Sequence, residues 1–338
     1  MMQISPEIQL FIREHSSDDV RVLALQAKKY PDIDMPTVIT QIAGRKVAAE
    51  KIPSWWEIEK IWYPKHLSLE QCSSEITARY KARLLQGDSL TDLTGGFGID
   101  CSFLATGFKS ATYVERQEEL CEIAAHNFPV LNLNHINIKN EDGVTYLQAM
   151  SPVDCLFLDP ARRNEHGGKT VAISDCEPNV AELEELLLQK ANRVMIKLSP
   201  MLDLSLALKE LKQTQEVHIL SVNNECKELL ILLGQTSPAE ISIHCVNLFT
   251  KGTQKEQHFV FTREQEQCSE CTYTDSLETY LYEPNASLLK AGAFRSIAAA
   301  YPVRKLHPNS HLYTSDTFIE NFPGRIFRIV NQCSFNKK

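Results

Sequence analysis

Short, unbroken apolar runs alternate with amphipathic segments through the middle of the chain. The runs have the length of buried strands, and the segments between them repeat their apolar positions at helical spacing. Strands are predicted at residues 90–93, 111–114, 136–139, 154–158, 193–197, 216–222 and 229–233, and helices at 99–105, 118–128, just after Gly143, 179–191 and 204–211. Apolar strands that alternate with helices indicate a parallel sheet covered on both faces, so we predict an α/β fold.

The pattern is different at the N-terminal end of the chain. Residues 1 to about 66 are predicted to be helical, with helices at 20–30 and 37–50, and a further helix at 69–86 leads to Gly87 and the first strand. Four aromatic side chains follow the second helix, and we expect them to pack this lobe onto the body of the protein: Trp55, Trp56, Trp62 and Tyr63.

Beyond Gly234 the apolar positions alternate with a period of two. This favours an antiparallel hairpin at 241–248 and 258–262, and further strands at 279–282 and 325–330 flank a helix at 287–300. We therefore predict three domains: an N-terminal helical lobe (1–68), a sheet domain (69–235) and a small C-terminal α+β domain (236–338).

Composition is typical of a globular protein with a full core, since 43% of the 338 residues are hydrophobic. No apolar run approaches the ~18 residues that a membrane span needs, and the first residues lack the basic and apolar regions of a secretion signal. The ten cysteines are scattered singly, apart from Cys268 and Cys271, which have no second pair downstream. We expect a cytoplasmic protein with reduced thiols, and a loop rather than a metal site at the cysteine pair.

Charge is distributed unevenly around the net value of −8. Residues 286–338 contain eight Lys or Arg against two Asp or Glu, so that this segment carries +6 and the remainder −14. An acidic body with a basic end favours an anionic macromolecule held at that end, and the alternative is a solvated face without a ligand. Besides Lys337 and Lys338, six residues make up this basic set: Lys290, Arg295, Arg304, Lys305, Arg325 and Arg328.

The chemistry of the sheet domain is concentrated in a glycine-rich turn. The first strand runs into Thr94-Gly95-Gly96-Phe97-Gly98, a helix follows, and the second strand ends on Glu115, 23 residues after Asp92. Glycine lets the backbone turn tightly and approach a ligand closely, and a carboxylate at the next strand end suits the two hydroxyls of a ribose. The turn indicates a nucleotide site, and the alternative is an ordinary connection from strand to helix.

Other polar residues lie where later strands end. Asp142 follows the third strand, Asp159-Pro160-Ala161-Arg162 follows the fourth, and Lys197 closes the fifth. Ligands of such sheets bind at the carboxyl ends of the strands, so we expect these residues to belong to one site.

Taken together, these motifs resemble those of class I S-adenosylmethionine-dependent methyltransferases, over about residues 70–235. The segment from Asp92 to Gly98 is similar to their glycine motif, with Thr94 at the first glycine, and its form is similar to that of ribosomal RNA guanine-N2 methyltransferases. The resemblance implies a Rossmann-like sheet and S-adenosylmethionine as cofactor. Six residues would bind it: Asp92, Thr94, Gly96, Gly98, Glu115, which would hold the ribose hydroxyls, and Asp142, near the adenine amino group.

The C-terminal end also resembles a known domain. Residues 282–285 and 306–309 are similar to the THUMP-like domain, ferredoxin-like in type, that follows such catalytic domains, and this implies RNA as partner.

The residues of the turn favour this cofactor over a dinucleotide. A bare phosphate prefers a helix N-terminus without acids, whereas Asp92 and the polar Thr94 suit a partner that carries an ammonium group. NAD(P) binding stays open as an alternative, as does a protein that binds the cofactor without transferring a methyl group.

Two acceptors are compatible with the motifs. In the reading we favour, the Asp159 carboxylate and the Pro160 carbonyl orient an exocyclic base amine. Arg162 or Arg163 would then stack on the base or hold phosphate in place of the missing aromatic residue. A protein or small molecule as substrate is a further alternative.

The other reading is a ribose 2′-hydroxyl. Lys81, Asp159, Lys197 and Glu225 or Glu228 resemble the constellation of RNA ribose 2′-O-methyltransferases, in which a lysine acts as general base. The alternative role for Lys81 and Lys197 is an ion pair. A cysteine nucleophile is excluded, because Ala161 and Ser199 stand at the two positions where it would be needed.

Overall fold

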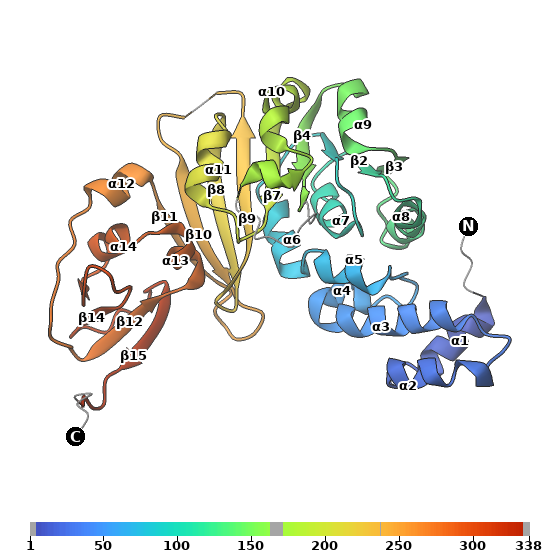
Figure 1. Cartoon of the computed structure of the whole chain (residues 1–338), viewed down its shortest axis with the longest axis horizontal. Helices are drawn as coiled ribbons and strands as arrows, with labels where there is room; N and C mark the ends of the chain where they lie inside the picture. Colours follow the sequence, from blue (N-terminus) through green and yellow to red (C-terminus); the bar gives the residue numbers. More distant parts are fainter. Residues whose placement is uncertain (1–4, 163–171, 237, 334–338) are drawn as a thin grey trace. The chain divides into compact units, whose positions relative to one another are not determined.

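The structure, a computed structural model, describes residues 5–162, 172–236 and 238–333 (Figure 1). It contains two compact units. The first comprises Met1–Asp159 with Gln189–Val194, and the second comprises Pro160–Leu188 with Met195–Lys338. Arg163, Lys337 and Lys338, named above as candidates, lie outside the described residues.

The predicted α/β fold is confirmed, as a mixed sheet of nine strands in the order β11-β10-β8-β9-β7-β4-β1-β2-β3. The strands are β1 (Ser89–Asp92), β2 (Ser110–Glu115), β3 (Ile136–Asn140), β4 (Val153–Leu158), β7 (Ala191–Leu198), β8 (Thr214–Val222), β9 (Glu225–Gly234), β10 (Ser242–Leu248) and β11 (Glu256–Phe261).

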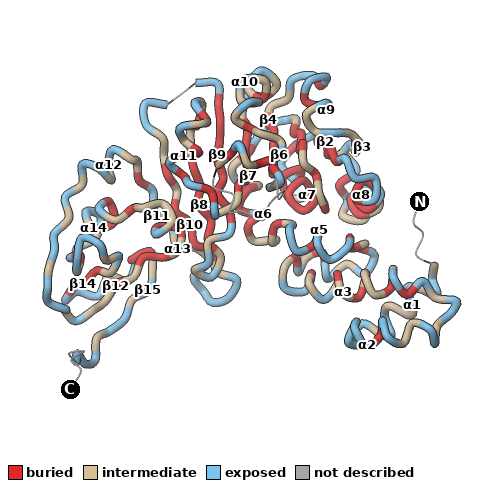
Figure 2. The backbone as a smooth tube through the Cα atoms, in the orientation of Figure 1, coloured by how far each residue is buried: buried red, intermediate tan, exposed pale blue. Residues whose placement is uncertain are grey.

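Within the first unit, β1 pairs in parallel with both β2 and β4, and β2 pairs in parallel with β3. The register places Asp92 beside Tyr113 on one neighbour and beside Phe157 on the other, so these strands end at one edge. Helices α7 (Ile99–Ala105), α8 (Glu118–Val130) and α9 (Gly143–Ala149) connect the strands. The long apolar runs are explained by burial, since residues 155–158 of β4 are all buried (Figure 2).

The N-terminal lobe is helical, as predicted, and consists of α1 (Pro6–Glu14), α2 (Val20–Leu25), the short 3₁₀ helix η1 (Ala27–Lys29), α3 (Met35–Lys51) and α4 (Pro53–Trp56). Helices α5 (His66–Gln71) and α6 (Glu75–Ala82) lead from the lobe to β1. The single helix predicted at 69–86 is wrong, because the chain leaves the helical conformation between α5 and α6. Two consecutive serines stand at this break, and serine hydroxyls compete with helical hydrogen bonds. Ser74 begins α6 as its N-cap residue, and the Ser73 hydroxyl bonds to Asp100.

The predicted packing of the aromatic cluster is confirmed for Trp55 and Tyr63, which are buried. The ring of Trp55 meets the ring of Phe97, in the glycine-rich turn, edge-on at a centroid distance of 5.2 Å. Trp56 is exposed instead, and Arg45 lies over its ring. The lobe therefore supports the turn directly.

The second unit begins with β5 (Ala161–Arg162), which pairs antiparallel with β6 (Cys176–Glu177). The 3₁₀ helix η2 (Ile173–Asp175) precedes β6, and α10 (Val180–Lys190) and α11 (Leu204–Glu210) flank β7. The hairpin β10–β11 was expected in the C-terminal domain, and this placement is wrong. β10 runs parallel to β8 over residues 242–248, so the hairpin extends the main sheet. Alternation along a strand reports one buried face and does not identify the sheet that the strand joins.

The remaining chain forms a small antiparallel sheet in the order β13-β14-β12-β15, made of β12 (Tyr280–Pro284), β13 (Arg304–Lys305), β14 (Tyr313–Ser315) and β15 (Gly324–Arg328). The helices in this part of the chain are α12 (Arg263–Cys268), α13 (Ala286–Ala291) and α14 (Arg295–Ala300), and α13 packs against β8, β9 and β10 of the main sheet. The helix predicted at 287–300 is split, because Gly292 adopts φ 76° and ends α13. Over the described residues, no helix has the length and apolar character that crossing a membrane requires.

Candidate active site

The glycine-rich turn joins β1 to α7 and is held by carboxylates at the ends of β1 and β2. The backbone N–H of Thr94 donates to Oδ1 of Asp92 (3.0 Å), and the backbone N–H of Gly96 donates to Oε2 of Glu115 (2.9 Å). Gly96 and Gly98 have φ of 55° and 86°, which L side chains rarely adopt. The residues chosen from sequence for this turn are therefore brought together, and the glycines are required by its conformation.

One carboxylate oxygen of Asp92 has no hydrogen-bond partner among the described residues. The residue is 1% exposed, and its Oδ2 is buried without a hydrogen-bond partner among the described residues. Burial raises the pKa of this carboxyl well above its usual value, against the bond from Thr94, and the nearby acids Asp100, Asp159 and Glu115 add to the rise. A buried acceptor left unpaired is costly, so the site suits a ligand that brings a cation or a donor. The ammonium of S-adenosylmethionine fits this requirement, and a phosphate does not.

Glu115, at the end of β2, is buried and already has backbone partners. Its Oε1 accepts from the N–H of Gln117 (2.8 Å), while Oε2 accepts from Gly96. Each carboxylate oxygen can accept a second hydrogen bond, so ribose hydroxyls can still donate to it. Glu115 consequently shapes the turn as well as offering the acceptor predicted from sequence.

Asp142 follows β3 and is the N-cap residue of α9. Its Oδ1 accepts from the N–H groups of Val144 (3.0 Å) and Thr145 (2.9 Å) at the start of α9. The residue is exposed. This cap fixes the direction of the carboxylate, and such a rigid carboxylate is suited to recognise an amino group.

The motif after β4 is tied to the glycine-rich turn. The backbone N–H of Asp159 donates to Oγ1 of Thr94 over 2.6 Å, so the end of β4 and the turn are joined directly. Sequence reasoning placed both residues in one site but missed this bond, which explains a polar residue at the position of the first glycine. Pro160 is buried and Ala161 is exposed, and Arg162 pairs through its backbone with Cys176.

Lys81 is fully buried in an ion pair. Its Nζ lies 2.9 Å from Oδ1 of Asp100 and donates to Oγ of Ser73 (2.8 Å), and the Ser73 hydroxyl donates to Oδ2 of Asp100 (2.7 Å). Asp100 is in the first turn of α7, so this group of three residues anchors the helix that follows the glycine-rich turn. The ion-pair alternative for Lys81 matches this arrangement.

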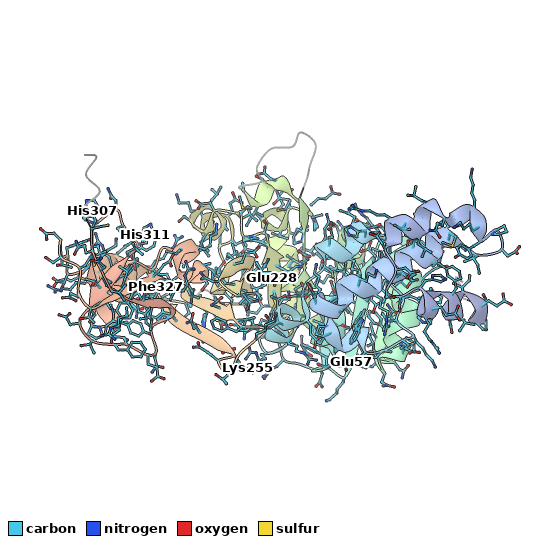
Figure 3. All side chains as sticks on the ribbon, turned by 90° about the horizontal axis from the view of Figure 1, so that it is seen from below. Glu57, Glu228, Lys255, His307, His311 and Phe327 are labelled. Carbon is cyan, nitrogen blue, oxygen red and sulfur yellow. The ribbon has the colours of Figure 1, made fainter. Side chains whose placement is uncertain are left out.

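Lys197 and the two candidate glutamates of the ribose 2′-hydroxyl alternative lie in the second unit. Lys197 in β7 and Glu228 in β9 are each 7% exposed. Figure 3 labels Glu228. Glu225 is exposed and pairs with Lys227 (2.6 Å). Of the two acids that the sequence left open, Glu228 is therefore the buried one.

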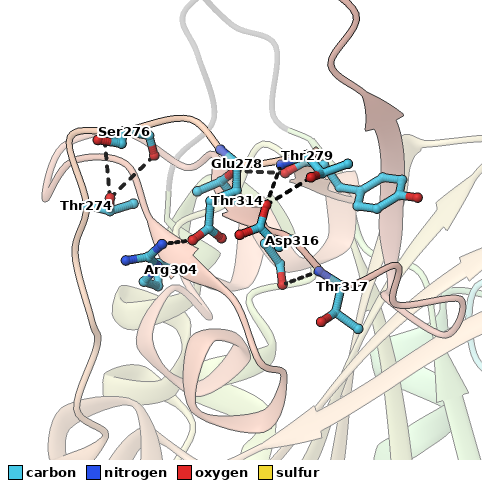
Figure 4. Close-up of polar contacts among 10 residues, drawn as sticks. Thr274, Ser276, Glu278, Thr279, Arg304, Thr314, Asp316 and Thr317 are labelled. Atoms are coloured by element: carbon cyan, nitrogen blue, oxygen red, sulfur yellow. Dashed lines mark hydrogen bonds and ion pairs between the residues drawn. The ribbon is translucent and has the colours of Figure 1, made fainter.

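The basic set is largely engaged by the protein itself. Arg304 pairs with Glu278, and Arg325 pairs with Glu283 (Figure 4 for Arg304). Lys305 is 4% exposed and donates to the carbonyl of Pro308. Lys290 and Arg295 donate to the backbone carbonyls of Leu202 and Gln267. Arg328 is exposed, and its side chain has no polar partner in the part of the chain that the structure describes. Of the six cations of this set that the structure describes, two are thus paired with glutamates and three donate to backbone carbonyls.

Comparison with known proteins gives two findings. A family model described as a ferredoxin-like domain matches residues 280–323. A crystal structure of a protein from Porphyromonas gingivalis W83, named "putative methyltransferase", is 36% identical to the chain and has a TM-score of 0.84. The match covers 96% of the present chain and 81% of the Porphyromonas gingivalis chain. Over residues 280–323 the C-terminal domain is thus confirmed as ferredoxin-like, and its likeness to a THUMP-like domain stays a prediction.

More distant structures include an rRNA methylase from Streptococcus thermophilus and a protein from Streptococcus mutans named "a putative methyltransferase", in complex with SAH. Both are 14% identical to the chain, and each match covers 47% of it. The matches cover 93% and 96% of the two streptococcal chains, and both TM-scores are 0.34, which is too low to support an argument. The search of curated proteins gave no match.

Proposed function

Because the chain belongs to the same methyltransferase family as the Porphyromonas gingivalis protein and depends on S-adenosylmethionine, we propose that it methylates an exocyclic base amine of structured RNA, ribosomal or transfer RNA. The cofactor supplies an electrophilic methyl group. The residues of this chain must bind it, orient the acceptor and take up one proton.

The first unit offers a binding residue for each part of the cofactor. Asp92 would hold the ammonium, Glu115 the ribose hydroxyls and Asp142 the adenine amino group. Thr94, Gly96 and Gly98 would form the turn beneath the amino-acid end. The Oδ2 of Asp92 supports this assignment, because it is a buried side-chain acceptor to which none of the described residues donates.

The bond between Asp159 and Thr94 carries the proposal for the acceptor. It holds the motif after β4 against the turn that would bind the cofactor, so an amine bound by the Asp159 carboxylate and the Pro160 carbonyl has its lone pair free to attack. A nitrogen–carbon bond forms, the carbon–sulfur bond breaks, and the amine proton leaves to the carboxylate or to water.

Arg162 would contact the base or its phosphate, in place of the aromatic residue that the motif lacks. A ribose hydroxyl is the second candidate, and the burial of Lys197 and Glu228 favours it. Lys81, however, is engaged by Asp100 and Ser73, so this candidate rests on Lys197 alone as base.

For RNA docking we propose the exposed end of β15 rather than the whole basic set. The ring of Phe327 is 45% exposed and Arg328 follows it, whereas Arg325, whose guanidinium lies 5.8 Å from the ring centre, is paired with Glu283. An exposed aromatic ring next to an exposed cation suits a stacked base and its phosphate.

Transfer of labelled methyl groups from S-adenosylmethionine to total RNA tests the function. We expect label in RNA that ribonuclease removes. Label in protein or in a small molecule, or NAD(P) binding instead of cofactor binding, would overturn the proposal.

The variant Lys197→Met separates the two acceptors. Loss of a general base costs about 10²–10⁴-fold in rate with cofactor affinity unchanged, whereas an amine acceptor needs no such base. For Lys197→Met we therefore expect the transfer rate to fall by much less than 10²-fold.

A further inference from the structure

Three histidines and a glutamate gather on one face of the sheet in the second unit, outside the proposed active site. Glu216 and His218 are two residues apart on β8, so both point to the same face. His218 lies directly beside His244 on β10, and His244 lies diagonal to His258 on β11, because its direct partner there is Val260. The topology thus brings residues 26 and 40 positions after His218 to one place.

The side chains are in contact. Nε2 of His218 is 3.2 Å from Oε2 of Glu216, and Nδ1 of His244 is 3.1 Å from Nε2 of His258. The rings of His218 and His244 stack with centroids 4.3 Å apart. One ligand atom each from Glu216, His218 and His244 lie within 4.8 Å of one another.

We propose that Glu216, His218 and His244 bind a divalent transition-metal ion of the zinc type, with His258 within reach as a fourth ligand. Imidazole and carboxylate are the ligand types that Zn²⁺ takes in tetrahedral sites, whereas Mg²⁺ and Ca²⁺ prefer oxygen ligands. Metal–ligand bonds of about 2.0–2.2 Å put tetrahedral ligand atoms roughly 3.3 Å apart. The Glu216–His218 and His244–His258 contacts already have this spacing.

The exposure of the histidines increases from His218 to His258, which leaves a path for an ion into the cluster. His218 is 2% exposed, His244 is half-buried and His258 is exposed, so the ion can enter from the His258 side. Glu216 supplies the negative charge that partly neutralises the cation.

Binding requires a small rearrangement. The His218 and His244 rings are nearly parallel, at 16°, and lone pairs in parallel planes do not converge. The His244 ring would turn, breaking the stack and exchanging its bond to His258 for a bond to the metal. The ion would then link β8, β10 and β11, three neighbouring strands at the end of the main sheet that β11 closes.

The test uses the full chain, stripped with a chelator, incubated with excess Zn²⁺ and dialysed before elemental analysis. We expect one zinc per chain, and a higher Tm with zinc than without. His244→Gln should lose the zinc and the Tm increase. His135→Gln, which changes a histidine bonded to the carbonyl of Ala105 in the other unit, is the matched control and should retain both.

Two further variants exclude other outcomes. Cys268→Ser with Cys271→Ser removes the cysteine pair and should leave zinc binding unchanged. Circular dichroism checks that His244→Gln is folded, and if it is not, Glu216→Gln at the half-buried rim replaces it, with an affinity at least about 10-fold weaker expected. No zinc in the parent protein, zinc lost with the cysteines, or zinc kept by folded His244→Gln would overturn the site. An unchanged affinity in His258→Gln would overturn the fourth ligand.

Discussion

The glycine-rich turn of the first unit and the basic set of the second use their charges in opposite ways. In the turn, Asp92 is buried and one of its oxygens has no hydrogen-bond partner within residues 5–162, 172–236 and 238–333, although nothing in the count of charges marks it out. In the ferredoxin-like domain, Arg304 and Arg325 are conspicuous in the sequence, yet both are paired with glutamates. A charge held for a ligand is recognised by its missing partner rather than by its sign or its density.

The two regions also differ in how firmly they are held. The turn is fixed by Glu115 from β2, by Asp159 from β4 and by Trp55 from the N-terminal lobe through Phe97. At the end of β15, Arg325, Phe327 and Arg328 are exposed. We therefore expect changes at the turn to have large effects on binding and transfer, and changes at β15 to have small ones.

The largest effect is expected from Asp159→Asn. The variant keeps the backbone bond to Thr94 but removes the carboxylate that orients the amine, so the transfer rate should fall about 10²–10⁴-fold with cofactor affinity unchanged. Single-turnover transfer and calorimetry measure the two quantities. Asp154→Asn, at the other end of β4, is the control and should transfer at the parent rate; a similar loss there would mean that the effect is structural.

The next effect concerns Lys81. Lys81→Met leaves the Asp100 carboxylate buried with one partner fewer, and breaking a buried pair costs about 3–5 kcal/mol in the free energy of unfolding. Denaturant unfolding measures it. Lys65→Met, which breaks the exposed pair with Glu119, should cost about 0–1 kcal/mol. If Lys81→Met is as stable as the parent but inactive, Lys81 acts in catalysis and the structural role is wrong.

Asp92→Asn should weaken cofactor binding and increase the stability of the folded protein. Loss of a hydrogen bond to the ammonium costs about 1.5–3 kcal/mol of affinity, while the unfolding free energy should rise because an unpaired buried carboxylate is removed. Calorimetry and denaturant unfolding measure the two effects. The exposed Asp88→Asn serves as control for both, and a drop in both quantities for Asp92→Asn would contradict the orphaned oxygen.

The stability difference should also depend on pH. The folded pKa of Asp92 is raised above the unfolded value of 3.8, so between these two values the folded protein binds more protons than the unfolded chain. The parent therefore loses stability as pH rises through that window, and asparagine, which does not titrate, does not. The advantage of Asp92→Asn should grow from pH 4 toward neutral pH, and urea unfolding at several pH values checks this.

The smallest effect is expected at β15. Arg328→Ala removes one exposed cation, so RNA affinity should fall modestly and the slope of log affinity against log salt should decrease by about 0.7 for one phosphate contact. Filter binding at several salt concentrations measures both. Arg304→Ala is the matched control, since its guanidinium pairs with Glu278, and an equal change there would mean that the whole basic set binds RNA.

Sequence was sufficient for features that depend on local pattern. The strands, the turn and the strand ends that carry Glu115 and Asp159 follow from apolar runs and glycines, and the structure places them as expected. The breaks at Ser73-Ser74 and at Gly292 were missed because each segment keeps enough helical spacing to obscure a local interruption.

Features that depend on partners distant in sequence could not be predicted. Lys81 is a catalytic candidate by motif and an ion-pair residue by contact, and only the fold brings Asp100 beside it. The hairpin β10–β11 alternates in the same way whichever sheet it joins. The histidine cluster could not be predicted from the sequence either, because His218 and His244 become neighbours only through the pairing of β8 with β10.

Nucleoside mass spectrometry of RNA from cells with and without the gene tests the central claim most directly. We predict that one nucleoside with its methyl group on the base is missing from cells that lack the gene, and that the methyl stays with the base fragment when the glycosidic bond is broken. A missing nucleoside with its methyl group on the ribose would contradict the amine acceptor, and an unchanged set of nucleosides would contradict RNA as the substrate.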